Sequence, residues 1–194
     1  MSNYRLTDEQ RSLKEAARRF AENKLRPIAL ETERKGKAMP REALKLMAEN
    51  GYVGLDIPTE YGGLGLDIMG CAVVLEELSS VWFSASTNAM SLLTGPLLVF
   101  GTDEQKQNYL PAISSGNLLT AFALTETDAG SDASSIQTFA ARDGDDWVIN
   151  GRKIYITNGA RADLIVLFAR TDRDAPRGEG ITLFLIEKGT PGFS

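Results

Sequence analysis

The spacing of the hydrophobic residues changes near Leu118, and this change limits the fold more than any other feature of the sequence. Before it, apolar residues recur every three or four positions, as on one face of an α-helix. After it they alternate with polar residues, as in a β-strand. The sequence therefore predicts an α+β fold, with an N-terminal all-α helical domain over residues 1–117 and an antiparallel β-barrel or sandwich domain over residues 118–194.

Helices are predicted for residues 7–28, 41–50, 67–79, 84–100 and 102–113. Thr7 and Thr102 each precede a glutamine by three positions, which is the capping-box pattern of a helix start. Pro27 is expected to kink or end the first helix, and Gly95-Pro96 to bend or break the fourth. The third helix, which is apolar all round, is expected to be buried.

Strands are predicted for residues 136–142, 147–150, 153–157, 164–170 and 181–187. Asn150-Gly151 is a strong signal for a two-residue hairpin turn. Because hairpins join antiparallel strands, we expect an antiparallel meander or barrel without a βαβ crossover. The last residues lead into a turn with the sheet incomplete, so we interpret the sequence as a fragment of a longer protein.

The composition excludes several kinds of function. The sequence contains no histidine, so Ser-His-Asp and Cys-His triads and almost all catalytic zinc sites are excluded, and we expect no metal. The single cysteine, Cys71, cannot form an intramolecular disulfide and is expected in the core, in a cytoplasmic protein. The net charge of -5 argues against nucleic-acid binding, and no apolar run is long enough to cross a membrane.

Glycines at positions 63 and 65 suggest a dinucleotide-binding loop, but the context does not fit. Ile68 stands where the third glycine of G-x-G-x-x-G belongs, and no βαβ unit surrounds the motif. We therefore interpret Gly63-Leu64-Gly65 as a turn between helices.

Two segments of the predicted β-domain carry residues suited to a ligand. In residues 121–132, amides near Gly130 and the Ser131 hydroxyl can bind a phosphate, although the composition alone favours a simple turn. In residues 153–159, alternation places Tyr155 and Thr157 on one strand face, where they can hold a planar heteroaromatic ring. A hydrophobic edge strand with two polar residues in solvent is an equal alternative.

These two segments, Phe-Ala-Leu-Thr-Glu-x-x-Ala-Gly-Ser-Asp at residues 122–132 and Trp147 to Gly159, closely resemble the acyl-CoA dehydrogenase family. The similarity extends to residues 6–10, 58–63 and 101–106. It implies FAD as the cofactor. By this resemblance the flavin ring is bound by Phe122, Leu124, Thr125, Tyr155, Ile156 and Thr157, and its diphosphate by Gly130 and Ser131.

The resemblance also implies a reaction. A carboxylate removes the α-proton of an acyl-CoA thioester while hydride passes from the β-carbon to FAD, and electrons leave to an electron-transferring flavoprotein. Ser131 then also contacts the thioester tail, and Thr94 contributes to an acyl pocket, although a plain core face is an alternative for Thr94. The family's base lies in a C-terminal helical domain, so no glutamate here, Glu126 included, is assigned as catalytic.

The resemblance further implies a homotetramer or dimer of the full-length protein, acting in fatty acid or amino acid catabolism. We expect the fragment alone to be inactive and to bind FAD weakly. A related flavoprotein oxidase or monooxygenase, or a non-catalytic interaction module without cofactor, is the alternative.

Overall fold

The computed structural model describes residues 5–194 and divides the chain into two compact units between Leu118 and Leu119. The first unit, here called the helical unit, contains the α-helices, and the second, the β unit, contains every β-strand of the described residues. The α+β class predicted from the change in hydrophobic spacing is confirmed.

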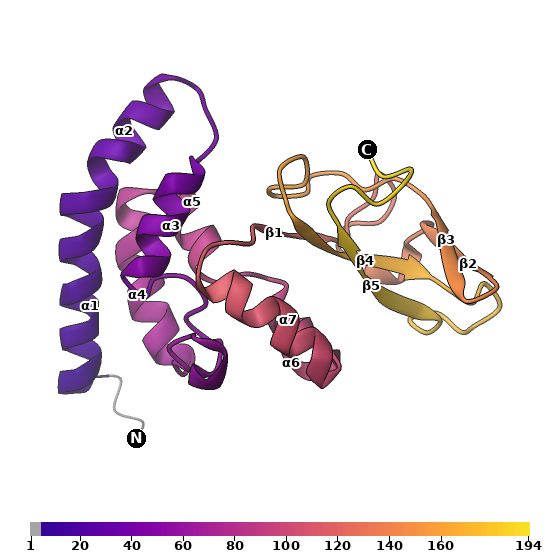
Figure 1. The fold of residues 1–194 in the computed structure, drawn as a ribbon, viewed down its shortest axis with the longest axis horizontal. Helices are drawn as coiled ribbons and strands as arrows, with labels where there is room; N and C mark the ends of the chain where they lie inside the picture. Colours follow the sequence, from indigo (N-terminus) through magenta and orange to yellow (C-terminus); the bar gives the residue numbers. More distant parts are fainter. Residues whose placement is uncertain (1–4) are drawn as a thin grey trace. The chain divides into compact units, whose positions relative to one another are not determined.

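The first helix is longer than its apolar stripe suggests. It runs as α1 (Asp8–Phe20), a π-helical turn (Ala21–Leu25) and α2 (Arg26–Arg34), and the predicted capping box of Thr7 begins it. Pro27 lacks the N–H that an α-helical bond to the preceding turn needs, and the π-helical turn lies immediately before it. The chain therefore bends at this point, as Figure 1 shows, and does not end.

The helical unit is completed by five further helices, α3 (Arg41–Glu49), α4 (Ile68–Val81), α5 (Phe83–Ala89), α6 (Thr94–Phe100) and α7 (Asp103–Ser114). The single helix predicted for residues 84–100 is broken, but at residues 90–93 and not at Gly95-Pro96. Pro96 lies in the first turn of α6, where a missing N–H removes no helical hydrogen bond.

A buried carboxylate with two basic partners fixes α1 against α4. The Glu77 side chain on α4 is only 2% exposed, and its carboxylate accepts a hydrogen bond of 2.8 Å from Arg18 Nε and lies 3.4 Å from Lys14 Nζ. One side of α4 is buried, together with Cys71, so the burial expected of the whole helix holds only in part, and burial raises the pKa of the Cys71 thiol. Ile68 and Met69, in the first turn, remain exposed.

The sheet of the β unit is mixed, which corrects the purely antiparallel prediction. Its strands are β1 (Thr120–Ala123), β2 (Phe139–Asp143), β3 (Asp146–Asn150), β4 (Leu164–Arg170) and β5 (Ile181–Glu187). The β2–β3 and β4–β5 pairs are antiparallel, but β1 and β2 both pair in parallel with β4. Residues 124–163 return the chain from β1 to β4 without an α-helix, so the parallel pairs form without a βαβ crossover, and only the purely antiparallel prediction is wrong.

The strand predicted for residues 153–157 does not form, and Asn150-Gly151 is not the hairpin turn. Asp143 pairs with Asp146, so the turn of the hairpin lies at Gly144, whose φ is 61°. Gly151 instead lies against Thr138, where an added Cβ would meet Thr138 Oγ1 at 2.3 Å. Glycine suits this position because two chain segments pass close together there, and not because a turn needs its dihedral angles.

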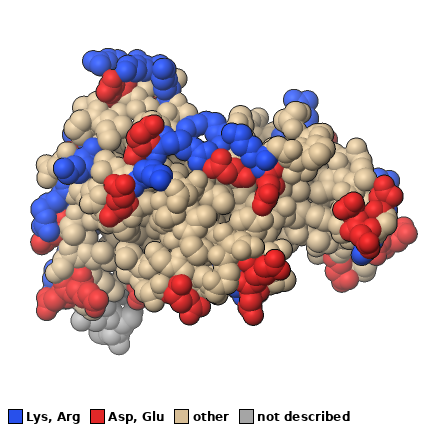
Figure 2. Space-filling view, in the orientation of Figure 1, with Lys and Arg blue, Asp and Glu red and all other residues tan. Residues whose placement is uncertain are grey.

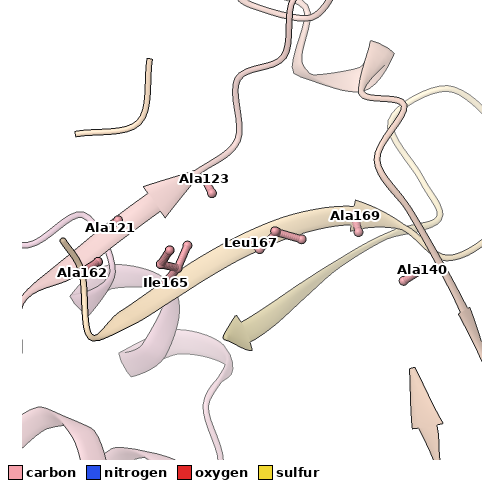
Figure 3. Packing of buried hydrophobic residues seen from close by; sticks show 7 residues of the cluster. All are labelled: Ala121, Ala123, Ala140, Ala162, Ile165, Leu167 and Ala169. Carbon is pink, nitrogen blue, oxygen red and sulfur yellow. The ribbon is translucent and has the colours of Figure 1, made fainter. Parts of the chain in front are cut away.

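Small side chains line the core of the β unit. Ala121 and Ala123 of β1, and Ala140 of β2, pack with Ile165 and Leu167 of β4 (Figure 3). The rings of Trp147 on β3 and Phe184 on β5 stack edge to face at 5.5 Å. Because β2 and β4 lie between these two strands, this contact shows that the sheet is strongly curled.

Charged residues mark the surfaces of both units. Acidic side chains gather where β2 ends and β3 begins, and basic ones near the end of α2 (Figure 2). Asp143 and Asp146 are exposed beside the edge strand β3, where charge opposes pairing with another sheet. Among the described residues, every helix is too short or too polar to cross a lipid bilayer.

The interpretation of Gly63 as a packing and turn residue leads to a prediction. A Cβ at Gly63 would lie 2.1 Å from the Ile57 carbonyl oxygen and 2.7 Å from that of Gly54, so Gly63→Ala must displace backbone. We expect a loss of about 2 kcal/mol or more in the free energy of unfolding, measured by urea titration. Gly95→Ala, which meets no atom within 4 Å, is the control and should change it by less than about 1 kcal/mol.

Candidate functional site

The first candidate segment is a loop inserted along one edge of β4. Ala123 at the end of β1 pairs with Leu167, and Phe139 at the start of β2 pairs with Arg170. Only Phe168 and Ala169 of β4 separate these two pairs. Residues 124–138, called here the insertion loop, therefore leave the sheet and return to it almost in line, as the chain between Ala123 and Ala140 does in Figure 3.

Glu126 closes the neck of the insertion loop. Its carboxylate accepts hydrogen bonds from the backbone N–H groups of Gln137, at 2.5 Å, and Thr138, at 2.9 Å. Its own N–H donates to the Ala129 carbonyl at 3.0 Å. The outgoing and returning ends of the loop are thus joined by one side chain, which is only 7% exposed.

Lys153 joins residues 153–158, which belong to the second candidate segment 153–159, to this neck. Its ammonium lies 2.7 Å from Glu126 Oε1 and donates to the Leu124 carbonyl at 2.9 Å, and its side chain is 7% exposed. Next to it, the Ile154 N–H donates to the Thr125 carbonyl at 2.9 Å. The two segments singled out from the sequence therefore lie side by side.

The electrostatics of the pair follow from burial and hydrogen bonding. Burial raises the pKa of the Glu126 carboxyl, but hydrogen bonds from Lys153 and from the amides of Gln137 and Thr138 outweigh burial and lower this pKa to about 2. Burial lowers the pKa of Lys153, and Glu126 opposes that shift. Glu126 is therefore an ionised structural carboxylate and a weak base.

Three hydroxyl groups on these two segments lack partners. Within residues 5–194, the side-chain hydroxyls of Thr125, Ser131 and Thr157 make no hydrogen bond to the protein. Thr125 is half-buried beside Ile154, and Ser131 and Thr157 are exposed. These groups are available to a ligand.

The aromatic and apolar candidates divide into two groups. Phe122 is half-buried on β1 with its ring 4.9 Å from that of Phe168, and Ile156 packs on the core. Tyr155 does not share a strand face with Thr157 as predicted, because it lies in a turn with φ 57° and is 91% exposed. An exposed aromatic residue in the left-handed region costs energy that its own packing does not offset.

Gly130 and Ser131 lie on the exposed part of the insertion loop, next to a polar cluster. Asp132 accepts hydrogen bonds from the Ser134 and Ser135 hydroxyls and pairs with Arg177 at 2.5 Å. The hydrogen bonds from the two serines, with the ion pair to Arg177, lower the pKa of Asp132 to about 2. This cluster fixes the loop immediately after Ser131.

Thr94 lies in the helical unit and is only 1% exposed. Its hydroxyl contacts Asp56 Oδ2 at 3.0 Å and the Ser91 carbonyl at 2.7 Å. The hydroxyl is thus already engaged within the unit.

Sequence reasoning did not find the roles of Glu126 and Lys153. The two residues are 27 positions apart, so no local spacing pairs them. The available signal was Lys153, the one base of residues 153–159, and three acids in residues 121–132. It identifies Glu126 as the partner only once both segments are placed.

The buried carboxylate makes the stability of the β unit depend on pH. The lowered pKa of Glu126 adds stability that is complete above its unfolded value of about 4.3 and is lost as the pH falls towards 2. Glu126→Gln, which strands the Lys153 ammonium, should cost about 3 kcal/mol at pH 7 and flatten this acid dependence. Urea unfolding from pH 7 to pH 3, followed by tryptophan fluorescence, measures both effects.

Asp132→Asn is the matched control, because that carboxyl also has a pKa of about 2 but is half exposed. Its effect at pH 7 should be much smaller than that of Glu126→Gln. Equal effects of the two variants would contradict the role given to burial.

Comparison with known proteins covers both units. Residues 7–117 match the family described as Acyl-CoA dehydrogenase, N-terminal domain, and residues 121–194 match Acyl-CoA dehydrogenase, middle domain. The short-chain specific acyl-CoA dehydrogenase of Clostridium acetobutylicum is 42% identical over 99% of this chain and 51% of its own length. The chain thus spans about half the length of the curated relatives it matches.

Solved structures agree with this result. A chain from the study of the electron transferring flavoprotein of Acidaminococcus fermentans has a TM-score of 0.89 and 41% identity, over 98% of this chain and 50% of that one. Glutaryl-CoA dehydrogenase of Mycobacterium smegmatis in complex with FADH2 has a TM-score of 0.87 and 31% identity, over 97% of this chain and 48% of that one. The chain belongs to the acyl-CoA dehydrogenase family.

Proposed function

We propose that the insertion loop and residues 153–158 bind FAD, as part of a protein that dehydrogenates an acyl-CoA thioester to the trans-2-enoyl-CoA. One observation carries the proposal: the free hydroxyls of Thr125, Ser131 and Thr157 lie on two loops that Glu126 and Lys153 tie together. Bound FAD would accept the hydride in this reaction.

Gly130 provides the test of fit. A Cβ at Gly130 would meet no protein atom within 4 Å, and its φ is not left-handed, so nothing within the chain requires glycine there. A glycine is needed where a ligand comes close to the backbone, and the neighbouring Ser131 hydroxyl suits a phosphate oxygen. The residues present therefore fit the diphosphate of FAD.

The proposed roles follow the chemistry of each group. Thr125 and Thr157 hydrogen-bond the polar edge of the flavin, Phe122, Leu124 and Ile156 contact its ring, and Tyr155 covers one face of it. Glu126 is not the base that removes the substrate α-proton, because its low pKa and its engaged oxygens oppose proton uptake.

The wider assignments rest on the relatives. We propose an acyl-CoA substrate and a flavoprotein electron acceptor, in a cytoplasmic homotetramer or dimer of the full-length protein. Residues 1–117 form the helical domain and residues 118–194 the β-domain. Thr94 is proposed to contribute packing to a wall of the acyl pocket and no hydrogen bond to the ligand, because its hydroxyl is already bonded to Asp56.

Titration with FAD and riboflavin tests the site. We expect the 194-residue chain to quench the fluorescence of both flavins, with little reduction of a dye acceptor by acyl-CoA. Ser131→Ala should weaken FAD binding about tenfold and spare riboflavin, which lacks the diphosphate, whereas Thr157→Ala should weaken both. Equal losses for both flavins in Ser131→Ala would refute the diphosphate contact. Turnover similar to that of full-length relatives would refute the interpretation that none of the glutamates in this chain is the catalytic base.

Tyr155 should show opposite effects on stability and on binding. Tyr155→Gly removes the left-handed strain without removing packing, so the free energy of unfolding should rise by up to about 1 kcal/mol. The same change removes the aromatic cover, so FAD should bind more weakly. Thermal unfolding and FAD titration measure the two effects. Tyr155→Phe, which keeps ring and strain, should change neither.

A further inference from the structure

Glu126 and Lys153 lie in a hydrogen-bonded connection between the insertion loop and residues 153–158. Three contacts follow one another there: Lys153 to Glu126, Lys153 to the Leu124 carbonyl, and Ile154 to the Thr125 carbonyl. Neither segment is paired as a strand at this place. Their relative position therefore depends on these contacts and not on a β-ladder.

The partnerless hydroxyls lie close to this connection along the chain. Thr125 directly precedes Glu126, and Thr157 follows Lys153 by four positions. Glu126 also binds the amides of Gln137 and Thr138, so it fixes the return of the loop that carries Ser131. A change at either charge would therefore displace donors on both segments together.

We propose that Glu126 and Lys153 are positioning residues that hold the two segments as one preformed cradle, so that they determine ligand affinity as well as stability. This inference rests on the proposed FAD site. Neither residue touches the ligand. Because misplacing binding groups by about 1 Å can cost up to about a hundredfold, an intact pair should matter for binding even in a folded chain.

A different result is expected if the ion pair of Glu126 and Lys153 only stabilises the fold. Glu77 provides the comparison, because it is also a buried carboxylate, 2% exposed and paired with Arg18 and Lys14, but it lies in the helical unit between α1 and α4. If ion pairs act only through global stability, Glu77→Gln and Glu126→Gln should affect binding alike at temperatures where both variants are folded.

The experiment is a double-mutant cycle on the 194-residue chain with FAD as the probe. We expect Glu126→Gln and Lys153→Met each to raise the dissociation constant about tenfold under conditions where circular dichroism shows a folded chain. The double variant should be no weaker than either single variant, because neither charge is then stranded. Glu77→Gln should leave the dissociation constant unchanged.

Hydrogen exchange without FAD supplies a second measurement. In Glu126→Gln and in Lys153→Met, amides of residues 124–131 and of residues 153–158 should exchange faster together, while those of β4 keep their protection. In Glu77→Gln, both segments should exchange as in the unchanged chain.

Each result decides something. Unchanged FAD affinity and unchanged exchange of the two segments in folded Glu126→Gln would overturn the positioning role. Faster exchange in only one segment would overturn the single cradle. If the unchanged chain does not bind FAD, the proposed function fails for this chain, and the exchange measurement still decides whether the pair couples the segments.

Discussion

The carboxylate of Glu126 is the interaction on which the arrangement of the β unit depends. It binds two backbone amides at the return of the insertion loop and the ammonium of Lys153, and it does so almost completely removed from water. A buried ion is tolerated only when its oxygens are fully engaged. The hydrogen bonds that the Glu126 carboxylate requires therefore determine the local path of the chain. They give a defined geometry to two loops that have no β-ladder.

The strand β4 provides the support for this arrangement. One of its edges pairs with β5, while the other pairs first with β1 and then with β2. Because both of its edges are occupied and its side chains are largely buried, β4 is a rigid base for the insertion loop. Loops that start and end on such a strand can hold ligand groups precisely while remaining exposed to solvent.

Local signals in the sequence predicted the elements they govern. The capping boxes at Thr7 and Thr102, the strands 164–170 and 181–187, and the α+β division were confirmed because spacing and short-range hydrogen bonds determine them. The hairpin turn predicted at Asn150-Gly151 and the strand predicted for residues 153–157 were wrong, because contacts with distant residues such as Thr138 override local preference. The candidate segments were predicted from their residue types and from the family resemblance, but their connection through Glu126 and Lys153 depends on tertiary contacts.

The insertion loop leaves and rejoins the edge of β4 almost in line, so sheet pairing and ligand recognition depend on different residues. β1 and β2 follow one edge of β4 as a single interrupted strand, so sheet pairing does not constrain the length or composition of the loop between them. Variation in that loop is limited mainly by Glu126, which closes its neck, and by Lys153, which pairs with Glu126. The architecture can thus diversify what it recognises while its scaffold stays unaltered.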